Sequence, residues 1–343
     1  MFKKMSSASI KAIRALSRTS SASLEVADCL KNLPSLIHSE LKSSNKELEE
    51  SSHYLFDGRG KAIRPTMCLL MAATANCTSY KRSFISPEQR TVAMVTEMIH
   101  TATLIHDDVI DNAWIRRGKD SVNKKWGERK AVLTGNFILA EASRVLSSTN
   151  HPQVIDLLSN VLEDLVRGEV MQLDAYSDNK DILFEQYLQK TFKKTASLMA
   201  YSCQSVALLS GLNDEKLTAA FQYGKNSGLA FQIIDDVLDF QASQSTFGKP
   251  VSVDLKLGLA TAPVLYALEE RPELLKLIKR QFKEKGDVEY ALAAVLDSSA
   301  LEKSLSLARQ YAGNAVGVLA QFSDCEEKYK LHSLTNDIIQ RQK

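Results

Sequence analysis

Cysteine is scarce in this sequence, and the five cysteines that do occur follow no recognisable pattern. They stand at scattered positions without any C-x-x-C spacing: Cys29, Cys68, Cys77, Cys203 and Cys325. An odd and scattered set argues against a disulfide framework or a structural zinc site, and it favours a reducing compartment.

Glycine, proline and aromatic residues are also few. The 343 residues include 14 glycines and 7 prolines, and only 7% are aromatic. Because glycine and proline weaken or end helices, their scarcity leaves room for long helices. The net charge of +2 creates no field that would favour nucleic acid or an anionic membrane surface. No run of about 18 apolar residues occurs, so we expect no membrane-spanning helix.

The N-terminal segment differs in composition from the rest of the chain. The part before Glu25 has seven serines, no acidic residue and five basic residues: Lys3, Lys4, Lys11, Arg14 and Arg18. This composition is typical of an organelle transit peptide, and a disordered basic tail is the alternative. We expect residues 1–30 to lie outside the folded domain, which then comprises residues 31–343.

Beyond residue 30 the apolar residues recur at helical spacing, and no strand pattern or hairpin signal appears. The pattern predicts an all-α fold, a large single-domain bundle without an internal linker. A capping box at residues 86–89 predicts that one helix begins at Pro87 and extends to about Ile110. Other helices are predicted over 32–56, from Ile63 or Pro65 onward, and over 128–148, 152–175, 181–211, 214–242, 257–269, 272–283, 287–295, 298–320 and 324–340.

Two acidic clusters of the same form interrupt this apolar, helical background. Residues 104–112 read LIHDDVIDN, and residues 232–240 read QIIDDVLDF. Since a helix turns about 100° per residue, Asp107 and Asp111 share one face of the first helix, and Asp108 lies to the side. The same spacing gives the second helix a matching polar stripe: Gly228, Gln232, Asp235 and Asp239.

Each acidic cluster is electrostatically unfavourable by itself. Three carboxylates within one turn repel one another, and both the helix dipole and burial increase the cost. A lone copy is most simply a solvated acidic helix end, but two copies that each follow apolar residues favour a metal site. All-oxygen ligands favour Mg²⁺, with Mn²⁺ as the alternative, over zinc. We therefore predict that the two clusters face each other and hold Mg²⁺ with a diphosphate between them.

Several basic residues are candidates for binding that diphosphate. Each of them alone reads as ordinary surface charge, but their arrangement around two acidic clusters makes them candidates, and arginine's planar fork suits phosphate oxygens. They fall in four stretches: Lys61 with Arg64, Arg116 with Arg117, Lys193 and Lys194 beside Thr195, and Lys249 in a Gly-Lys-Pro turn.

In order and spacing these motifs resemble the trans-prenyl diphosphate synthases, the head-to-tail elongating enzymes of isoprenoid metabolism. The resemblance covers nearly everything after residue 30. Besides the aspartates it includes Gly60–Pro65, His100, Arg116–Gly118, Arg167–Glu169 with Gln172, Lys194–Ala196, Phe231–Gln232 and Gly248–Pro250. The stretches YGKNSGLAFQIIDDVLDF and DLKLGLATAPVL look most similar to the mitochondrial decaprenyl and solanesyl branch, which makes the C45–C50 side chain of ubiquinone.

The resemblance implies an isoprenoid-synthase bundle with a central active-site cavity, and it implies roles by position. Four residues would bind the diphosphate of isopentenyl diphosphate: Lys61, Arg64, His100 and Arg117. Three would bind the allylic diphosphate: Arg116, Lys194 and Lys249. The main Mg²⁺ ligands would be Asp107, Asp111 and Asp235, with Asp108 and Asp239 close by, while Thr195 and Gln232 would line the reaction centre.

The length of the product is predicted from the residues before the first cluster. In the family the growing chain runs below Asp107, and short-chain members have an aromatic residue four or five positions earlier. Here those positions are Thr103 and Ala102, and small side chains leave the cavity open. We expect a product well beyond C20. Asn136, where the family usually has Asp, is a departure that we expect to alter a supporting contact, and Arg59 is one that we expect to be tolerated.

Two other functions remain as alternatives. A class I terpene cyclase, a lyase of the same scaffold, usually keeps only one Asp-rich motif, so the second motif argues against it. A non-catalytic partner subunit predicts loss of aspartates, and both clusters are intact.

The family also implies partners and a location. The substrates would be isopentenyl diphosphate and a farnesyl or geranylgeranyl primer. The assembly would be a homodimer or a heteromer with a second synthase subunit. The location would be the mitochondrial matrix, with inner-membrane association and peripheral membrane contact for product release.

Overall fold

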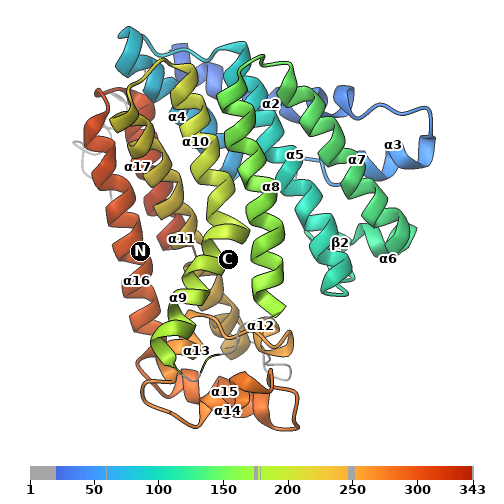
Figure 1. Ribbon diagram of the computed structural model, residues 1–343, viewed down its shortest axis with the longest axis vertical. Coiled ribbons are helices and arrows are strands. Elements are labelled where there is room, and N and C mark those ends of the chain that lie inside the picture. The colour runs from blue at the N-terminus through green and yellow to red at the C-terminus, as the bar shows by residue number, and fades with distance from the viewer. Residues whose placement is uncertain (1–20, 59, 174–176, 178, 246–251, 342–343) are drawn as a thin grey trace, which may run out of the picture.

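The computed structural model describes residues 21–58, 60–173, 177, 179–245 and 252–341, and these residues are almost entirely helical (Figure 1). In the first half of the chain the elements are α2 (Ser21–Glu40), α3 (Lys46–His53), α4 (Ile63–Tyr80), α5 (Pro87–Ile110), β1 (Ile115–Arg116), β2 (Lys119–Asp120), α6 (Val122–Trp126), α7 (Glu128–Ser147) and α8 (Pro152–Leu173). In the second half they are α9 (Lys180–Thr191), the π-helical turn η1 (Phe192–Ala196), α10 (Ser197–Leu209), α11 (Asp214–Ser245), α12 (Val253–Lys256), α13 (Ala262–Ala267), α14 (Leu274–Lys279), α15 (Asp287–Leu296), α16 (Ala300–Val318), the 3₁₀ turn η2 (Leu319–Gln321) and α17 (Glu326–Gln340). The prediction of an all-α fold is confirmed.

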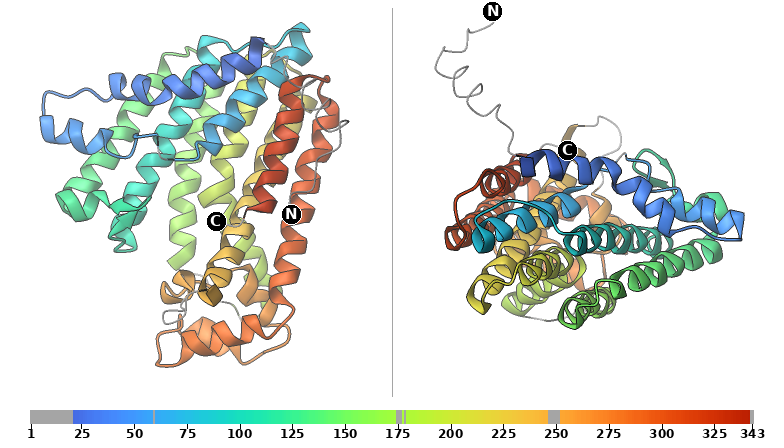
Figure 2. Two further views of the ribbon diagram at one scale, coloured as in Figure 1. Left: turned by 180° about the vertical axis from the view of Figure 1, so that it is seen from behind. Right: turned by 90° about the horizontal axis from the view of Figure 1, so that it is seen from above.

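The long helices lie side by side, and the short helices α12 to α15 gather at one end, at the bottom of Figure 1. Figure 2 shows the same bundle from behind and from above. The buried apolar side chains form two clusters, which we call the first core and the second core. Helix α11 packs against α10 and α16 and contributes to both cores. Its first half contributes Tyr223 and Ala230 to one core, and its second half contributes Ile233 and Phe240 to the other. The second acidic cluster therefore lies where the two cores meet.

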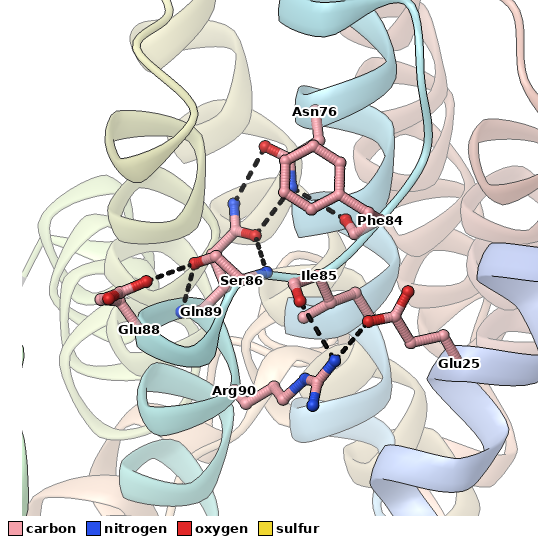
Figure 3. Close-up of polar contacts among 8 residues, drawn as sticks. All are labelled: Glu25, Asn76, Phe84, Ile85, Ser86, Glu88, Gln89 and Arg90. Carbon is pink, nitrogen blue, oxygen red and sulfur yellow. Dashed lines mark hydrogen bonds and ion pairs between the residues drawn. The ribbon is translucent and has the colours of Figure 1, made fainter.

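The start of α5 is fixed by the predicted capping box (Figure 3). The Ser86 Oγ accepts a hydrogen bond from the Gln89 backbone N–H at 3.2 Å, and the Gln89 Oε1 accepts one from the Ser86 N–H at 2.9 Å. The buried Gln89 side chain also donates to the Val206 carbonyl and the Ser210 hydroxyl of α10, each at 3.0 Å. Asn76 of α4 donates to the same Oε1 at 2.8 Å. This network orients α5 relative to α4 and α10, and α5 carries the first acidic cluster at its other end.

Two predicted helices, over 32–56 and over 257–269, are not continuous in the structure. The helix predicted over 32–56 is two helices, since the Asn45 side chain accepts hydrogen bonds from the Glu47 and Leu48 N–H groups and starts α3. Of the helix predicted over 257–269, only Ala262–Ala267 forms, as α13, and residues 257–261 are not helical.

A small hairpin that the sequence analysis did not predict follows α5. Strands β1 and β2 pair antiparallel, with Arg116 opposite Lys119. The two turn residues, Arg117 and Gly118, have φ values of 52° and 76°. Positive φ at both positions is typical of a two-residue type I′ turn, whose twist matches that of the paired strands. The hairpin holds the two adjacent arginines at the end of α5.

The N-terminal boundary of the described structure lies earlier than residue 31. Helix α2 begins at Ser21, and Val26 is buried in the first core. The expected boundary at residue 30 thus falls inside a helix, and residues 1–20 lie outside the described residues. Within the described part of the chain, no helix has the length and hydropathy needed to cross a membrane.

Candidate active site

A cavity of about 490 Å³ lies where α4, α5, the hairpin, α9, η1 and α11 approach one another. Most of the predicted site residues line it: Arg64, His100, Thr103, Asp107, Arg116, Arg117, Lys194, Thr195, Gln232 and Asp235. The fold therefore brings together side chains that are widely separated in sequence. We refer to this space as the central cavity.

The first acidic cluster presents Asp107 to the central cavity from the last turn of α5. Burial raises the pKa of Asp107 to about 6, and the positive charge of Lys194 opposes this shift. Burial also raises the pKa of Asp111, at the C-terminal cap of α5, and Glu169 raises it further by repulsion. These carboxylates are destabilised as anions, so a bound cation would relieve them.

Asp108 is placed apart from the cavity-lining carboxylates. It is fully buried, and its Oδ1 accepts hydrogen bonds from the Arg116 Nε, at 2.9 Å, and from the Arg116 Nη2. The Asn123 side chain donates to the Asp108 backbone carbonyl at 3.0 Å. These contacts fasten the hairpin and the start of α6 to the end of α5, and they position Arg116 at the cavity wall.

The second acidic cluster presents Asp235 to the same cavity, paired with an arginine that the sequence analysis missed. The Arg341 Nη2 lies 2.9 Å from the Asp235 Oδ1, and Arg341 also donates to the Phe231 carbonyl at 3.0 Å. Its guanidinium carbon is 4.0 Å from the centre of the Phe231 ring. Burial raises the pKa of Asp235, and the Arg341 charge opposes this shift. No local pattern indicated Arg341, because it comes from the far end of the chain.

Two further carboxyl groups line the central cavity beside Asp235. Asp236 accepts hydrogen bonds from the Tyr187 hydroxyl at 2.6 Å and from the Gln232 amide at 2.9 Å, and burial raises its pKa to about 6. Burial, and then repulsion from Asp236, raise the pKa of Asp254 to about 8. Neither residue was predicted for the site, although Asp254 opens the quoted stretch DLKLGLATAPVL.

Asp239, predicted beside the metal, serves as a cap for α12. Its carboxylate accepts hydrogen bonds from the backbone N–H groups of Val253, at 3.1 Å, and Asp254, at 3.2 Å, and from the Ser252 hydroxyl. The negative charge at the start of a helix is favourable. By fixing α12, Asp239 places Asp254 at the cavity.

The π-helical turn η1 interrupts the helix that was predicted to be continuous over 181–211. Such turns occur frequently at functional sites because they shift side chains out of the regular helical order. Here the turn directs Thr195 toward α11, where its hydroxyl donates to the Gln232 Oε1 at 2.9 Å. Lys194 forms an ion pair of 2.5 Å with Glu169 and lines the central cavity.

Three residues predicted to bind the diphosphate of isopentenyl diphosphate, Arg64, His100 and Arg117, line the central cavity. The Arg64 Nη1 lies 3.0 Å from the His100 Nε2, burial lowers the pKa of Arg64 to about 10, and burial and then the Arg64 charge hold the pKa of His100 well below its usual value. His100 is thus neutral and accepts a hydrogen bond from Arg64. A Cβ atom at Gly60 would lie 2.9 Å from the Arg117 Nη1, so a side chain there would displace the Arg117 guanidinium from its present position. Lys61 is exposed, and its charge is among those that oppose the rise in the pKa of Asp235 caused by burial.

Three further residues do not line the central cavity, and a fourth lies outside the described part of the chain. Ala102 is fully buried in the first core. Asn136 is exposed on α7 and does not line the central cavity. The His106 Nε2 lies 3.3 Å from the Val132 carbonyl of α7, and His106 lines the second cavity described below. Lys249 lies outside the described residues.

A second cavity of about 350 Å³ adjoins the first and is lined mainly by apolar side chains of α5 and α8. Thr103, Asp107 and Lys194 line both cavities, so the two spaces share the wall formed by the first acidic cluster. The apolar part is lined by Ile110, Leu139, Leu162, Leu165, Val166 and Val170. We refer to it as the α5–α8 cavity.

Comparison with known proteins identifies the family. The sequence profile described as Polyprenyl synthetase matches residues 45–295. The chain belongs to the polyprenyl synthetase family. It is 47% identical over 314 residues to the all trans-polyprenyl-diphosphate synthase PDSS1 of Mus musculus, with 92% of this chain and 76% of the relative covered. It is 38% identical over 363 residues to the probable mitochondrial hexaprenyl pyrophosphate synthase of Neurospora crassa, with 93% and 81% covered.

A solved structure supports the same conclusion at the level of the fold. The polyprenyl synthase of Caulobacter crescentus, complexed with calcium and isoprenyl diphosphate, superposes with a TM-score of 0.82 at 30% identity. The match covers 94% of this chain and 97% of that chain. As a polyprenyl synthetase, this chain has the all-α isoprenoid synthase fold and is a prenyltransferase that elongates all-trans prenyl chains with a divalent metal.

The donor groups of this polyprenyl synthetase fit a divalent cation that is completed by substrate. Within the described residues, no three His, Cys, Asp or Glu side chains converge on a single metal position. Mg²⁺ commonly takes only one or two carboxylates and fills its remaining positions with water and phosphate oxygens. Asp107 and Asp111 on α5, and Asp235 on α11, supply oxygen ligands of this kind, with pKa values raised chiefly by burial.

We expect Mg²⁺ with inorganic diphosphate to raise the melting temperature of this polyprenyl synthetase more at pH 8 than at pH 5.5. In the metal-free protein, a carboxyl group whose pKa is raised by folding binds more protons in the folded state than in the unfolded state, so its contribution to the free energy of unfolding falls as the pH rises. For Asp107 this fall spans about pH 4 to 6, and for Asp254 it extends to about pH 8. A cation binds the deprotonated form and removes this penalty. Thermal unfolding with and without the ligands, across this pH range, measures the difference. An equal shift at both pH values would contradict the metal assignment.

Proposed function

We propose that this protein is a Mg²⁺-dependent long-chain all-trans-polyprenyl diphosphate synthase that adds isopentenyl diphosphate to an allylic diphosphate primer. The observation that carries the proposal is that Asp107 and Asp235, from two separate helices, line one cavity together with several basic residues: Arg64, Arg116, Arg117, Lys190 and Lys194. A terpene cyclase binds one diphosphate, and it needs neither the second acidic cluster nor a second cationic pocket. An inactive partner subunit would not keep both clusters.

The two substrates are assigned to opposite parts of the central cavity. Arg64, His100 and Arg117, with Lys61 nearby, form the site for the diphosphate of isopentenyl diphosphate. Because His100 is neutral and bonded to Arg64, it orients that guanidinium toward the phosphate oxygens. The allylic diphosphate lies near Lys194 and Arg116, between the two acidic clusters, and Lys249 joins this set by sequence position.

The chemistry requires charge stabilisation at the departing diphosphate. When bound, Mg²⁺ neutralises the diphosphate as the allylic carbon–oxygen bond breaks. Lys194 and Arg116 are aimed at the same place by their ion pairs with Glu169 and Asp108, so they add fixed positive charge without reorganisation. The alkene of isopentenyl diphosphate then attacks the allylic cation, a new carbon–carbon bond forms, and a proton leaves to the released diphosphate.

Thr195 and Gln232 act together at the reaction centre. Their hydrogen bond of 2.9 Å and the bond from Gln232 to Asp236 leave the Gln232 side chain with a single orientation. A fixed polar pair beside the developing cation stabilises its positive charge with oxygen dipoles, and it also keeps the Asp235–Asp236 pair in position.

The α5–α8 cavity is the proposed path of the growing chain. It begins at Thr103 and Asp107 and continues between apolar side chains, which is the surface that a polyprenyl tail requires. Thr103 is small and lies at the entrance, so the path is open. We propose a product in the C45–C50 range, the size of a ubiquinone side chain, and a farnesyl or geranylgeranyl primer.

We also propose a mitochondrial enzyme with a partner. The basic, serine-rich N-terminal segment supports matrix targeting ahead of one synthase domain, and a relative is named as mitochondrial. Three side chains of the α5–α8 cavity are exposed: Ile110, Val166 and Val170. Exposed apolar groups of this kind mark contact surfaces. The proposed contact is a second copy or a second synthase subunit, with peripheral inner-membrane contact during product release.

The direct test is elongation by the purified full-length chain. Radiolabelled isopentenyl diphosphate, a farnesyl or geranylgeranyl primer and Mg²⁺ are incubated with the protein, alone and co-expressed with a candidate second subunit, and the products are dephosphorylated and sized. We expect linear polyprenols well beyond C20. Cyclic hydrocarbons would favour the terpene cyclase, and no elongation in either preparation would overturn the proposal.

A further inference from the structure

Two half-buried cysteines meet where the start of α17 crosses α4, away from the central cavity. The segment Ser323–Cys325 leads into α17 and runs along one face of α4. The Ser323 backbone N–H donates to the Thr78 hydroxyl at 3.0 Å, and the Cys325 Sγ lies 3.9 Å from the Thr74 Oγ1. Between these contacts, the Cys77 Sγ lies 3.9 Å from the Asp324 carbonyl oxygen. The segment therefore runs antiparallel to the helix and carries Cys325 past Cys77.

The separation of the two sulfurs is limited by these contacts. The Asp324 carbonyl belongs to the peptide bond that joins Asp324 to Cys325, so the Cys77 sulfur touches the backbone immediately before its potential partner. The Cys325 sulfur in turn contacts Thr74, which is one helical turn before Cys77 on α4. Burial raises the pKa of Cys325 to about 11, and repulsion from Cys77 is among the further causes. The two groups are thus close enough to act on each other.

We propose that Cys77 and Cys325 are a redox-sensitive pair that forms a reversible disulfide between α4 and the start of α17. A disulfide requires Cα atoms within about 7 Å of each other and side chains that point toward one another. Neighbouring contacts on both sides of the pair already hold the two backbones together, so the bond requires rotation of side chains and little backbone movement.

The other cysteines are unsuited to this reaction. Cys68 and Cys203 also repel each other, but both are almost completely buried in the first core, where a soluble oxidant does not reach them. Cys29 is half-buried on α2, where its charged neighbours are Arg90, Glu25 and Asp28. Burial raises the pKa of Cys29, as it does for Cys325, but no cysteine is among these neighbours of Cys29. Cys29 is therefore a suitable control for the Cys77–Cys325 pair.

Glutathione disulfide is the oxidant that balances the reaction. The Cys77 thiolate attacks glutathione disulfide, forms a mixed disulfide and releases one glutathione. The Cys325 thiolate then attacks the Cys77 sulfur and releases the second glutathione, so two protein thiols are oxidised and one glutathione disulfide is reduced to two glutathiones. Because its pKa is raised, Cys325 is deprotonated rarely near neutral pH, and the second step is expected to be the slow one.

The bond would fasten the helix that carries Arg341 toward the active site. Helix α17 begins at the cysteine pair and ends at Gln340, next to Arg341, which pairs with Asp235. Midway, the Tyr223 hydroxyl of α11 donates to the Leu331 carbonyl at 2.9 Å. Oxidation would thus fix the start of α17, and Arg341, directly after the end of α17, contacts the second acidic cluster. The disulfide would also close a loop that contains most of the chain. We therefore expect the redox state of this pair to change the stability of the bundle.

The test is oxidation of the full-length protein with glutathione disulfide, followed by alkylation, digestion and mass spectrometry. We expect a peptide pair linked through Cys77 and Cys325, 2 Da lighter than the sum of the free peptides, and loss of two of the five thiols. The melting temperature of the oxidised protein should rise by about 5 °C and return on reduction.

Single substitutions provide the controls. C77S and C325S should each abolish the link and the oxidation-dependent rise, while C29S should retain both. Separate alkylation of Cys77 and Cys325 after oxidation, stable glutathione adducts on each, or a link between two chains would overturn the proposal. The alkylation result in the unmutated protein decides the question even if a serine variant folds poorly.

Discussion

Asp107→Asn should lower kcat for prenyl transfer by roughly 1,000-fold, the largest effect that we expect from any single substitution. Asparagine keeps the shape of the side chain and removes the charge that holds the cation. Asp107 is the carboxylate of the first cluster that lines both the central cavity and the α5–α8 cavity, so its loss affects the metal at the point where the chain grows. The fold should persist, because burial destabilises the Asp107 anion in the absence of metal.

Two controls separate this effect from a general loss of structure. Asp156 is exposed on α8, so Asp156→Asn should leave kcat unchanged. Asp108→Asn breaks the buried pair with Arg116, so it should lower the melting temperature even without Mg²⁺ and diphosphate, whereas Asp107→Asn should not. Steady-state kinetics and thermal unfolding of the three variants provide the comparison. Activity of Asp107→Asn within tenfold of the unmutated protein would contradict the metal assignment.

Thr103→Phe should shorten the product to C20 or less while leaving the first condensations intact. Thr103 lies at the shared wall of the two cavities, and its hydroxyl donates to the His100 carbonyl at 2.8 Å, which fixes its position one turn before Asp107. A phenyl ring there fills the entrance of the α5–α8 cavity and blocks the path of the tail. The chemistry occurs on the other side of Asp107, so turnover with a short primer should continue.

Matched aromatic substitutions on the same helix test whether position is what matters. Thr91→Phe, three turns earlier on α5, should leave product length unchanged. Ala102→Phe should instead lower the stability of the fold, because Ala102 is fully buried in the core and a phenyl group there overpacks it. Reversed-phase sizing of labelled products measures the effect. An unchanged product distribution for Thr103→Phe would show that the chain follows another path.

The sequence predicted the elements whose signals are local. The capping box at Ser86 and Gln89 depends on four consecutive residues, so the start of α5 and its direction followed from the sequence. The pairing of Asp107 with Asp111 on one face followed from the helical period. By contrast, the hairpin after α5 depends on positive φ at Arg117, a residue that favours such angles little, and the signal was missed. The π-helical turn at Lys194 and Thr195 has no sequence signature of this kind.

By itself, the sequence determined that two repeated acidic clusters on apolar helices need a cation, because the repulsion within each cluster is independent of the rest of the fold. It also determined the order of the basic stretches around them. Only the tertiary structure decided which carboxylates lie at the cavity. Asp108 and Asp239 hold the hairpin and α12, while Asp254 and Arg341 join the site from elsewhere in the chain. The physical reason is that helical period fixes the face on which a side chain lies, whereas its partner is fixed by packing between segments that are distant in sequence.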